Sequence, residues 1–199
     1  MELSKRVQNV SPSATLALSA KAKQLQKDGY DIKNLTAGEP NFNTPEHIKK
    51  AAIQSIQAGK SDFYTAALGI VELRKAIAKA TNAQYHTDYT FENVAVTVGG
   101  KFSLYAVSQT ILDPGDEVLI PLPYWVSYSE QVKLAEGKPV FVLPETKSLK
   151  VTVAALEAKR TEKTKAVIIN SPQNPSGVIY TRAELEAIGN WAVKNNIWL

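Results

Sequence analysis

The residues best suited to chemistry lie in the loop 170–177, whose sequence is NSPQNPSG. Two prolines stiffen it on either side of Asn174 and hold one amide side chain, both donor and acceptor, in a fixed position. The apolar run 166–169 before the loop is typical of a buried strand, and Thr181 with Glu184 forms a capping box that predicts a helix after it. The loop therefore follows the carboxyl end of a strand, where open α/β sheets bind their ligands.

A second candidate site is the segment 98–103, VGGKFS, which joins a predicted strand to a predicted helix. Gly99 and Gly100 let the backbone approach a ligand closely, and the start of a helix attracts an anion such as a phosphate. The chain has neither the dinucleotide fingerprint nor the Walker pattern, so nucleotide binding is the weaker form of this hypothesis. The alternative, a tight turn with no ligand, stays open on these residues alone.

A tryptophan follows the next predicted strand, in the segment 121–125, PLPYW. Trp125, held by the neighbouring prolines, is suited to stacking on a planar heteroaromatic ring, although a packed core tryptophan is the alternative. Trp191 and Trp198 fall in a predicted helix and a predicted strand, and we interpret both as core residues.

Two further loops offer a backbone N–H and a phenol. Gly38, in the loop 36–42, leaves its N–H open to a carboxylate, with a simple hinge as the alternative. Tyr64, in the loop 63–69, has a hydroxyl that could reach a phosphate, with an ordinary half-buried tyrosine as the alternative. His47 and His86 are interpreted as surface residues.

Composition limits the classes of function. The 199 residues carry a net charge of +4 that is spread along the chain, which argues against a nucleic-acid partner. The chain has no cysteine and two histidines, so disulfides and thiolate chemistry are excluded and we expect no metal site. No signal sequence or membrane-length apolar run is present, and we expect a cytoplasmic protein with no membrane contact.

Strands and helices alternate through most of the chain, which predicts the α/β class with a mostly parallel sheet covered by helices on both faces. Strands are expected at residues 94–98, 118–120, 140–143 and 166–169. Helices are expected at residues 13–26, 44–59, 73–80, 102–112, 129–135 and 153–159 and from residue 181 onward, and Thr44 is the expected N-cap of the second of these. The first forty residues do not follow this alternation and predict a separate lobe or arm. Residues 195–199 read as a turn and the start of another strand, so we expect the front part of a longer protein.

The loops, taken in order, resemble the class I pyridoxal-phosphate-dependent aminotransferases, and most of all the bacterial aspartate aminotransferase branch. The resemblance extends from about residue 6 to residue 199 and rests on the segments 37–42, 64–74, 98–101, 123–125 and 170–175. It implies the N-terminal part of the fold type I large domain, a three-layer αβα structure with a mostly parallel sheet. Residues 1–43 would be an N-terminal arm and small-domain segment, and residues 44–199 an incomplete pyridoxal-phosphate-binding large domain.

The resemblance implies a role for each candidate residue, with pyridoxal 5'-phosphate as the cofactor. Gly99, Gly100 and Lys101 would line the phosphate site. Trp125 would stack on the pyridine ring and also touch the substrate, and Asn174 would hydrogen-bond the ring's 3-oxygen and help to place the substrate carboxylate.

Gly38 would contact the substrate carboxylate through its backbone N–H, by the same resemblance. Tyr64 would reach the phosphate in the neighbouring subunit, which implies a homodimer with shared sites. The substrates would be an L-amino acid, aspartate-like, and a 2-oxo acid.

The family's Schiff-base lysine is expected beyond Leu199, so no residue of this chain is assigned a covalent catalytic role and the 199 residues alone are expected to be inactive. Three alternatives remain open: a pyridoxal-phosphate-dependent lyase of the same fold, a non-catalytic truncated paralogue that serves in dimerisation or regulation, and a phosphate-binding module for nucleotides.

Overall fold

The computed structural model describes residues 2–36, 38–60, 62–144 and 147–199. The chain divides into two compact units. The first, called the sheet unit here, consists of Met1–Ser13 together with Gly100–Leu199. The second, called the helical unit, is Ala14–Gly99.

The sheet unit is built on three parallel strands in the order β2-β1-β3. Their bounds are Glu117–Pro121 for β1, Lys138–Val142 for β2 and Thr164–Val167 for β3. In the central strand β1, Leu119 lies opposite Val140 on β2 and opposite Val167 on β3. Trp198 extends the sheet beyond β3 through a parallel bridge to Ala166. The expected strands at 118–120, 140–143 and 166–169 are thereby confirmed, with small shifts in their bounds.

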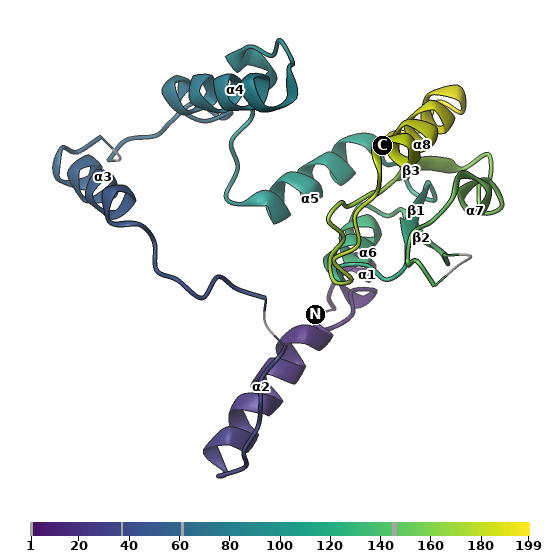
Figure 1. The fold of residues 1–199 in the computed structure, drawn as a ribbon, viewed down its shortest axis with the longest axis horizontal. Coiled ribbons are helices and arrows are strands. Elements are labelled where there is room, and N and C mark those ends of the chain that lie inside the picture. The colour runs from purple at the N-terminus through teal and green to yellow at the C-terminus, as the bar shows by residue number, and fades with distance from the viewer. Residues whose placement is uncertain (1, 37, 61, 145–146) are drawn as a thin grey trace. The chain divides into compact units, whose positions relative to one another are not determined.

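Successive strand residues point to opposite faces of the sheet and enter two separate hydrophobic clusters. Leu119 and Val167 pack with residues of α7 and α8, whereas Ile120 and Ala166 pack with residues next to and within α6. The helices of this unit are Lys5–Gln8 (α1), Gly100–Ile111 (α5), Ser127–Leu134 (α6), Val153–Glu157 (α7) and Arg182–Lys194 (α8). Helices therefore cover both faces, which confirms the α/β class with a parallel sheet (Figure 1).

The helix after the asparagine loop begins where its capping box predicts. Thr181 accepts a hydrogen bond from the Glu184 N–H, and the Glu184 carboxylate accepts one from the Thr181 N–H at 2.6 Å. These two reciprocal bonds satisfy donors that the first turn of α8 would otherwise leave unpaired. The start of α8, and hence the end of the loop, is fixed by local sequence.

The helical unit consists of helices joined by extended segments. Its elements are Ala14–Lys27 (α2), Glu46–Gln57 (α3), Val71–Tyr85 (α4) and the 3-10 helix Phe91–Asn93 (η1). The N-cap of α3 is Pro45, which makes no side-chain cap hydrogen bond, so the expected cap at Thr44 is wrong by one residue. His86 is exposed and ends α4 with a left-handed φ of 56°, and His47 is also exposed, as expected.

Two further sequence expectations are wrong for the described residues. The segment 94–98 is not a strand: Val96 donates one hydrogen bond to the Leu68 carbonyl at 3.0 Å, but no described strand forms a ladder with it. An apolar run becomes a strand only where a neighbour pairs with its backbone. Trp198 is 59% exposed at the edge of the sheet, unlike Trp191, which is buried in the core as predicted.

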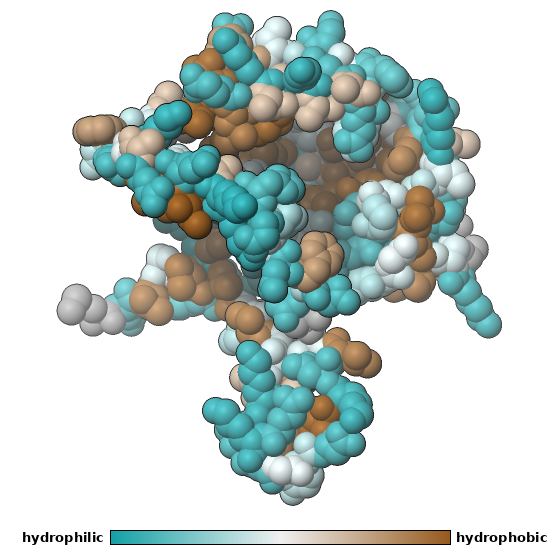
Figure 2. All heavy atoms as spheres, turned by 60° about the vertical axis from the view of Figure 1, so that its left-hand side comes forward, coloured by the Kyte–Doolittle hydropathy of each residue, from teal (hydrophilic) through white to brown (hydrophobic). Residues whose placement is uncertain are grey.

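Many apolar side chains of the described residues remain accessible to solvent. Figure 2 shows such side chains, in brown, among polar ones on one face of the molecule. Examples on α3 are Ile48, Ile53 and Ile56. None of the helices among the described residues combines the length and the apolar character that crossing a bilayer requires.

Candidate functional site

Two of the predicted site loops follow the carboxyl ends of neighbouring parallel strands. The loop that carries Trp125 follows β1, and the loop that carries Asn174 follows β3. The Leu122 N–H donates to the Val142 carbonyl at 2.9 Å, and the Ile168 N–H donates to the Leu119 carbonyl at 3.0 Å. Because the strands are parallel, both loops leave the sheet at the same edge.

Internal hydrogen bonds fix the backbone of the asparagine loop. The Asn174 N–H donates to Oδ1 of Asn170 at 2.8 Å, and the Gly177 N–H donates to the Gln173 carbonyl at 2.7 Å. Gln173 is buried and its side-chain oxygen accepts a hydrogen bond from the Ser176 hydroxyl. Asn174 itself is exposed.

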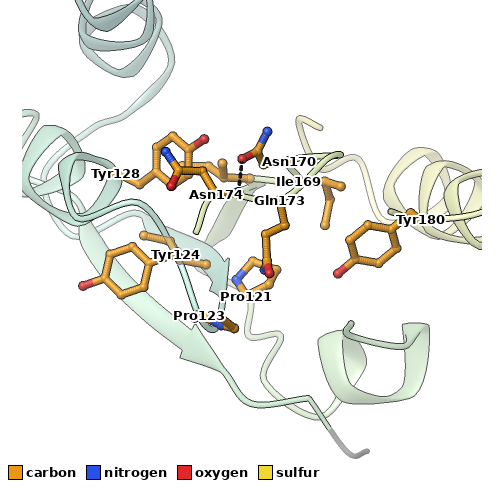
Figure 3. A pocket seen from close by; sticks show the side chains of 11 residues that line it. Pro121, Pro123, Tyr124, Tyr128, Ile169, Asn170, Gln173, Asn174 and Tyr180 are labelled. Atoms are coloured by element: carbon orange, nitrogen blue, oxygen red, sulfur yellow. Dashed lines mark hydrogen bonds between the residues drawn. The ribbon is translucent and has the colours of Figure 1, made fainter. Parts of the chain in front are cut away.

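A small pocket lies next to Asn170 and Asn174. Asn170 and Asn174 line it together with Tyr124, Tyr128 and Tyr180 (Figure 3). Its volume is about 10 Å³, which is room for roughly one water molecule. In this structure the pocket therefore has no room for an aromatic ring.

Trp125 is half-buried at the end of its loop and contacts two other side chains. The ammonium of Lys101 lies 4.9 Å from the centre of the indole ring, within the range of a cation–π interaction. Tyr128 meets the indole edge to face, with ring centres 5.4 Å apart and planes at 90°. The structure thus brings Lys101 and Trp125 together, and Tyr128 links Trp125 to the pocket beside Asn174.

The diglycine segment has space for a ligand. Gly99 has a φ of +90°, a left-handed conformation that favours glycine, and α5 begins directly after it. A Cβ atom added at Gly100 would meet no atom within 4 Å, so packing does not explain the absence of a side chain there. The first turn of a helix also leaves N–H groups that the helix itself does not satisfy. This open, N–H-rich helix start beside a lysine fits a phosphate.

Gly38 and Tyr64 belong to the helical unit. Both are exposed, and a Cβ atom at Gly38 would meet nothing within 4 Å. Ala37, which begins the motif that carries Gly38, lies outside the described residues. The roles of Gly38 and Tyr64 stay predictions.

Two residues of this region, Tyr128 and Gln131, were not singled out from the sequence. The Gln131 side chain is buried, and its Nε2 donates to the carbonyl oxygen of Lys101 at 2.8 Å. Tyr128 and Gln131 are three residues apart on α6, which places them on the same side of that helix, and Trp125 lies in the loop three residues before Tyr128. That spacing directly after a strand could have pointed to both residues.

The environment of α6 shifts the pKa of two groups near the site. Burial raises the pKa of the Tyr128 phenol, so it stays protonated and able to donate. Burial also opposes ionisation of Glu130, but hydrogen bonds from the Ser11 N–H, Lys133 and Ser129 outweigh it and lower the pKa of that carboxyl. The Ser11 N–H lies 2.8 Å from Glu130 Oε2, which attaches the N-terminal residues to α6.

A parallel sheet with helices on both faces places the chain in the αβα class of α/β proteins, and comparison with known proteins identifies the family. The family model for aminotransferase class I and II matches residues 30–199. The chain therefore belongs to this family, whose aspartate aminotransferase members depend on pyridoxal phosphate.

Several relatives are similar over nearly the whole chain. The aspartate aminotransferase of Bacillus subtilis is 48% identical over 198 residues, which is 99% of this chain and 50% of that protein. The asparagine–oxo-acid transaminase of Streptococcus mutans is 47% identical over 98% of this chain and 50% of that protein. A probable aspartate aminotransferase of Streptomyces griseus is 44% identical over 99% of this chain and 92% of that protein.

The fold is also that of solved aminotransferases. The aspartate aminotransferase of Thermus thermophilus with maleate matches with a TM-score of 0.95 and 44% identity, over 100% of this chain and 52% of that chain. The structure therefore corresponds to the N-terminal part of fold type I. The chain spans about half the length of most of the curated relatives that it matches.

Proposed function

We propose that this chain forms the cofactor-facing N-terminal part of an aminotransferase that moves an amino group between an aspartate-like L-amino acid and a 2-oxo acid. The observation that carries the proposal is the Lys101 ammonium 4.9 Å from the Trp125 indole, at the sheet edge where the Asn174 loop also emerges. Relatives named as aspartate and asparagine aminotransferases support the substrate class.

The residues at the start of α5 and at this sheet edge suit pyridoxal 5'-phosphate. When bound, this cofactor supplies a carbonyl carbon for the amino group and a ring that withdraws electrons from the reacting carbon. In this proposal Gly99, Gly100 and Lys101 hold the phosphate, which the helix start and the ammonium attract. Trp125 packs on the ring and limits water access, and the Asn174 amide donates to the ring oxygen and orients the substrate carboxylate.

Two further roles and the domain division complete the proposal. Gly38 offers its N–H to the substrate carboxylate, and Tyr64 extends to the phosphate of a second subunit in a homodimer with shared sites. Tyr64 is fully exposed in this chain, which suits a residue that serves a neighbour. Residues 1–43 would be the arm and small-domain segment, and residues 44–199 part of the large domain of a cytoplasmic enzyme.

Site variants of the full-length protein test the proposed cofactor contacts. We expect Trp125→Ala to weaken pyridoxal phosphate binding about fivefold or more, because stacking of this kind contributes about 1 kcal/mol beyond area burial. Trp125→Phe should restore part of the affinity. Asn174→Ala should raise the KM for aspartate, whereas Asn190→Ala, a change at an exposed asparagine of α8, should leave both unchanged. Unchanged affinity and kinetics in the Trp125 and Asn174 variants would contradict the assigned roles.

An activity assay of the 199-residue chain alone tests whether catalysis requires residues beyond Leu199. This chain includes no lysine assigned to carry the cofactor, since that residue is expected beyond Leu199. We expect the purified chain, mixed with aspartate, 2-oxoglutarate and pyridoxal phosphate, to form no oxaloacetate. Turnover well above a blank without protein would show that the chain contains a complete catalytic set.

A further inference from the structure

One buried amide joins the helix start that would hold a phosphate to the helix that follows Trp125. Gln131 lies on α6 and is 7% exposed. Its Nε2 donates at 2.8 Å to the carbonyl oxygen of Lys101, 30 positions earlier in the chain. Both residues belong to the sheet unit, so the bond links two helices within one compact unit.

Helix formation alone does not require this hydrogen bond. Lys101 is the second residue of α5, and a carbonyl at that position accepts from the N–H four residues later in an α-helix. A carbonyl oxygen has a second lone pair, and Gln131 uses it. The bond therefore fixes where α5 starts relative to α6, rather than whether α5 forms.

The same stretch of chain also holds the Lys101 side chain. The Lys101 ammonium lies over the Trp125 indole, and Tyr128 packs edge to face against that indole. Gln131 and Trp125 thus hold Lys101 at two points, one on its backbone and one on its side chain. The relative position of the α5 start and the indole depends on both contacts.

We propose that Gln131 is a positioning residue that sets the distance between the start of α5 and the indole of Trp125. The inference rests on the proposed cofactor site, in which the α5 start holds the phosphate and the indole holds the ring. A ligand that carries both groups at a fixed separation needs both parts of the site in register. A ligand with the ring alone does not. Loss of the Gln131 hydrogen bond should therefore weaken binding of the ligand that carries both groups and leave the affinity for the ligand with the ring alone unchanged.

The test compares pyridoxal phosphate with pyridoxal, which lacks the phosphate, in the full-length protein. Gln131→Met keeps the length of the side chain and removes the donor. We expect the variant to bind pyridoxal phosphate about tenfold more weakly, equivalent to about 1.4 kcal/mol, and to bind pyridoxal within about twofold of the unchanged protein. Dissociation constants follow from the absorbance of the bound ring. The matched control is Gln109→Met, at an exposed glutamine of α5, which should change neither affinity.

Each outcome decides the inference. Equal affinity of Gln131→Met and the unchanged protein for pyridoxal phosphate would overturn the role of Gln131 and leave the proposed function standing. An equal loss for both ligands would indicate a general structural role and also overturn it. If the unchanged protein binds neither ligand, the proposed cofactor site fails, and this inference fails with it.

A second variant tests the proposal independently in case Gln131→Met does not fold. Gln131→Asn keeps the amide but shortens the side chain by one methylene, so its nitrogen should no longer reach the Lys101 carbonyl. It should reproduce the selective loss of pyridoxal phosphate affinity while the melting temperature of the cofactor-free protein stays close to the unchanged value. Full affinity for pyridoxal phosphate in a folded Gln131→Asn protein would contradict the proposal.

Discussion

In the sheet unit, residues of all three strands and of α6, α7 and α8 are almost inaccessible to solvent, whereas the described part of the helical unit buries only Ala22, Arg74 and Ala78. Both units contain amphipathic helices, so the difference does not lie in helix formation. In the sheet unit, parallel strands and the helices between them alternate in sequence, and each helix returns to pack on the sheet. Apolar residues at helical spacing thus predict that a helix forms, but they do not predict which other element packs against its apolar face.

The largest expected contrast between the units is the cost of removing an apolar side chain. Leu119→Ala, in the centre of β1, should lower the free energy of unfolding by about 3 kcal/mol, because it leaves a cavity at a position with 0% exposure. Ile53→Ala, at a 52% exposed position of α3, should cost less than about 0.5 kcal/mol. Urea denaturation of both variants measures the difference. Equal costs would show that α3 is covered in solution, and the contrast between the units would disappear.

A glycine of the helical unit marks a point where this unit is tightly packed. A Cβ atom at Gly69 would lie 2.8 Å from Cβ of Val96, and the glycine has a φ of +92°. Gly69→Ala should therefore destabilise the local structure by about 2 kcal/mol. Gly29→Ala has a similar φ of +89° but no atom within 4 Å, and should cost about 1 kcal/mol.

Amide hydrogen exchange at Val96, whose N–H donates to the Leu68 carbonyl at 3.0 Å, measures this local effect. Exchange at Val96 should accelerate in Gly69→Ala and not in Gly29→Ala. The same rate in both variants would mean that the contact between Gly69 and Val96 does not hold this part of the helical unit together.

The two units also differ in how their helices begin. Thr181→Ala removes the capping box of α8 and should cost about 1 kcal/mol. Thr44→Ala, before α3, should cost only a few tenths of a kcal/mol, since Pro45 is the N-cap and no side chain caps that helix. Thermal denaturation of the two variants provides the comparison. If Thr44→Ala destabilised the protein as much as Thr181→Ala, Thr44 would be the N-cap of α3, as expected from the sequence.

The smallest predicted effect is a pH dependence in the sheet unit. Hydrogen bonds from Arg160 and from the indole N–H of Trp191 lower the pKa of Glu157 from 4.5 to about 2. A carboxyl with a lowered pKa in the folded state contributes stability that is fully present above pH 4.5 and is lost as the pH falls towards 2. The stability difference between the unchanged protein and Glu157→Gln should shrink over this range in urea denaturation at several pH values. A constant difference would show that the ionised carboxylate does not contribute.

The resemblance of the sequence to aminotransferases predicted the family, whereas the alternation of strand and helix patterns predicted the parallel α/β class and the order of the elements in the sheet unit. The bounds of these elements depend on local signals, such as the capping box at Thr181 and the glycine and proline residues of the loops, which act within a few residues. The prediction was wrong at 94–98, because no described strand pairs with that segment, and at Trp198, which pairs with Ala166 of β3 but has a side chain that is 59% exposed.

The order of loops and strands could thus be predicted from the chain alone, because turn and cap chemistry is local. The meeting of the Lys101 ammonium with the Trp125 indole, and of the Gln131 amide with the Lys101 carbonyl, could not. These contacts depend on how α5 and α6 pack beside the sheet. Lys101 is 24 positions from Trp125 and 30 positions from Gln131 in the chain. These residues come into contact because side chains of different elements pack closely together, and no local periodicity in the sequence predicts such packing.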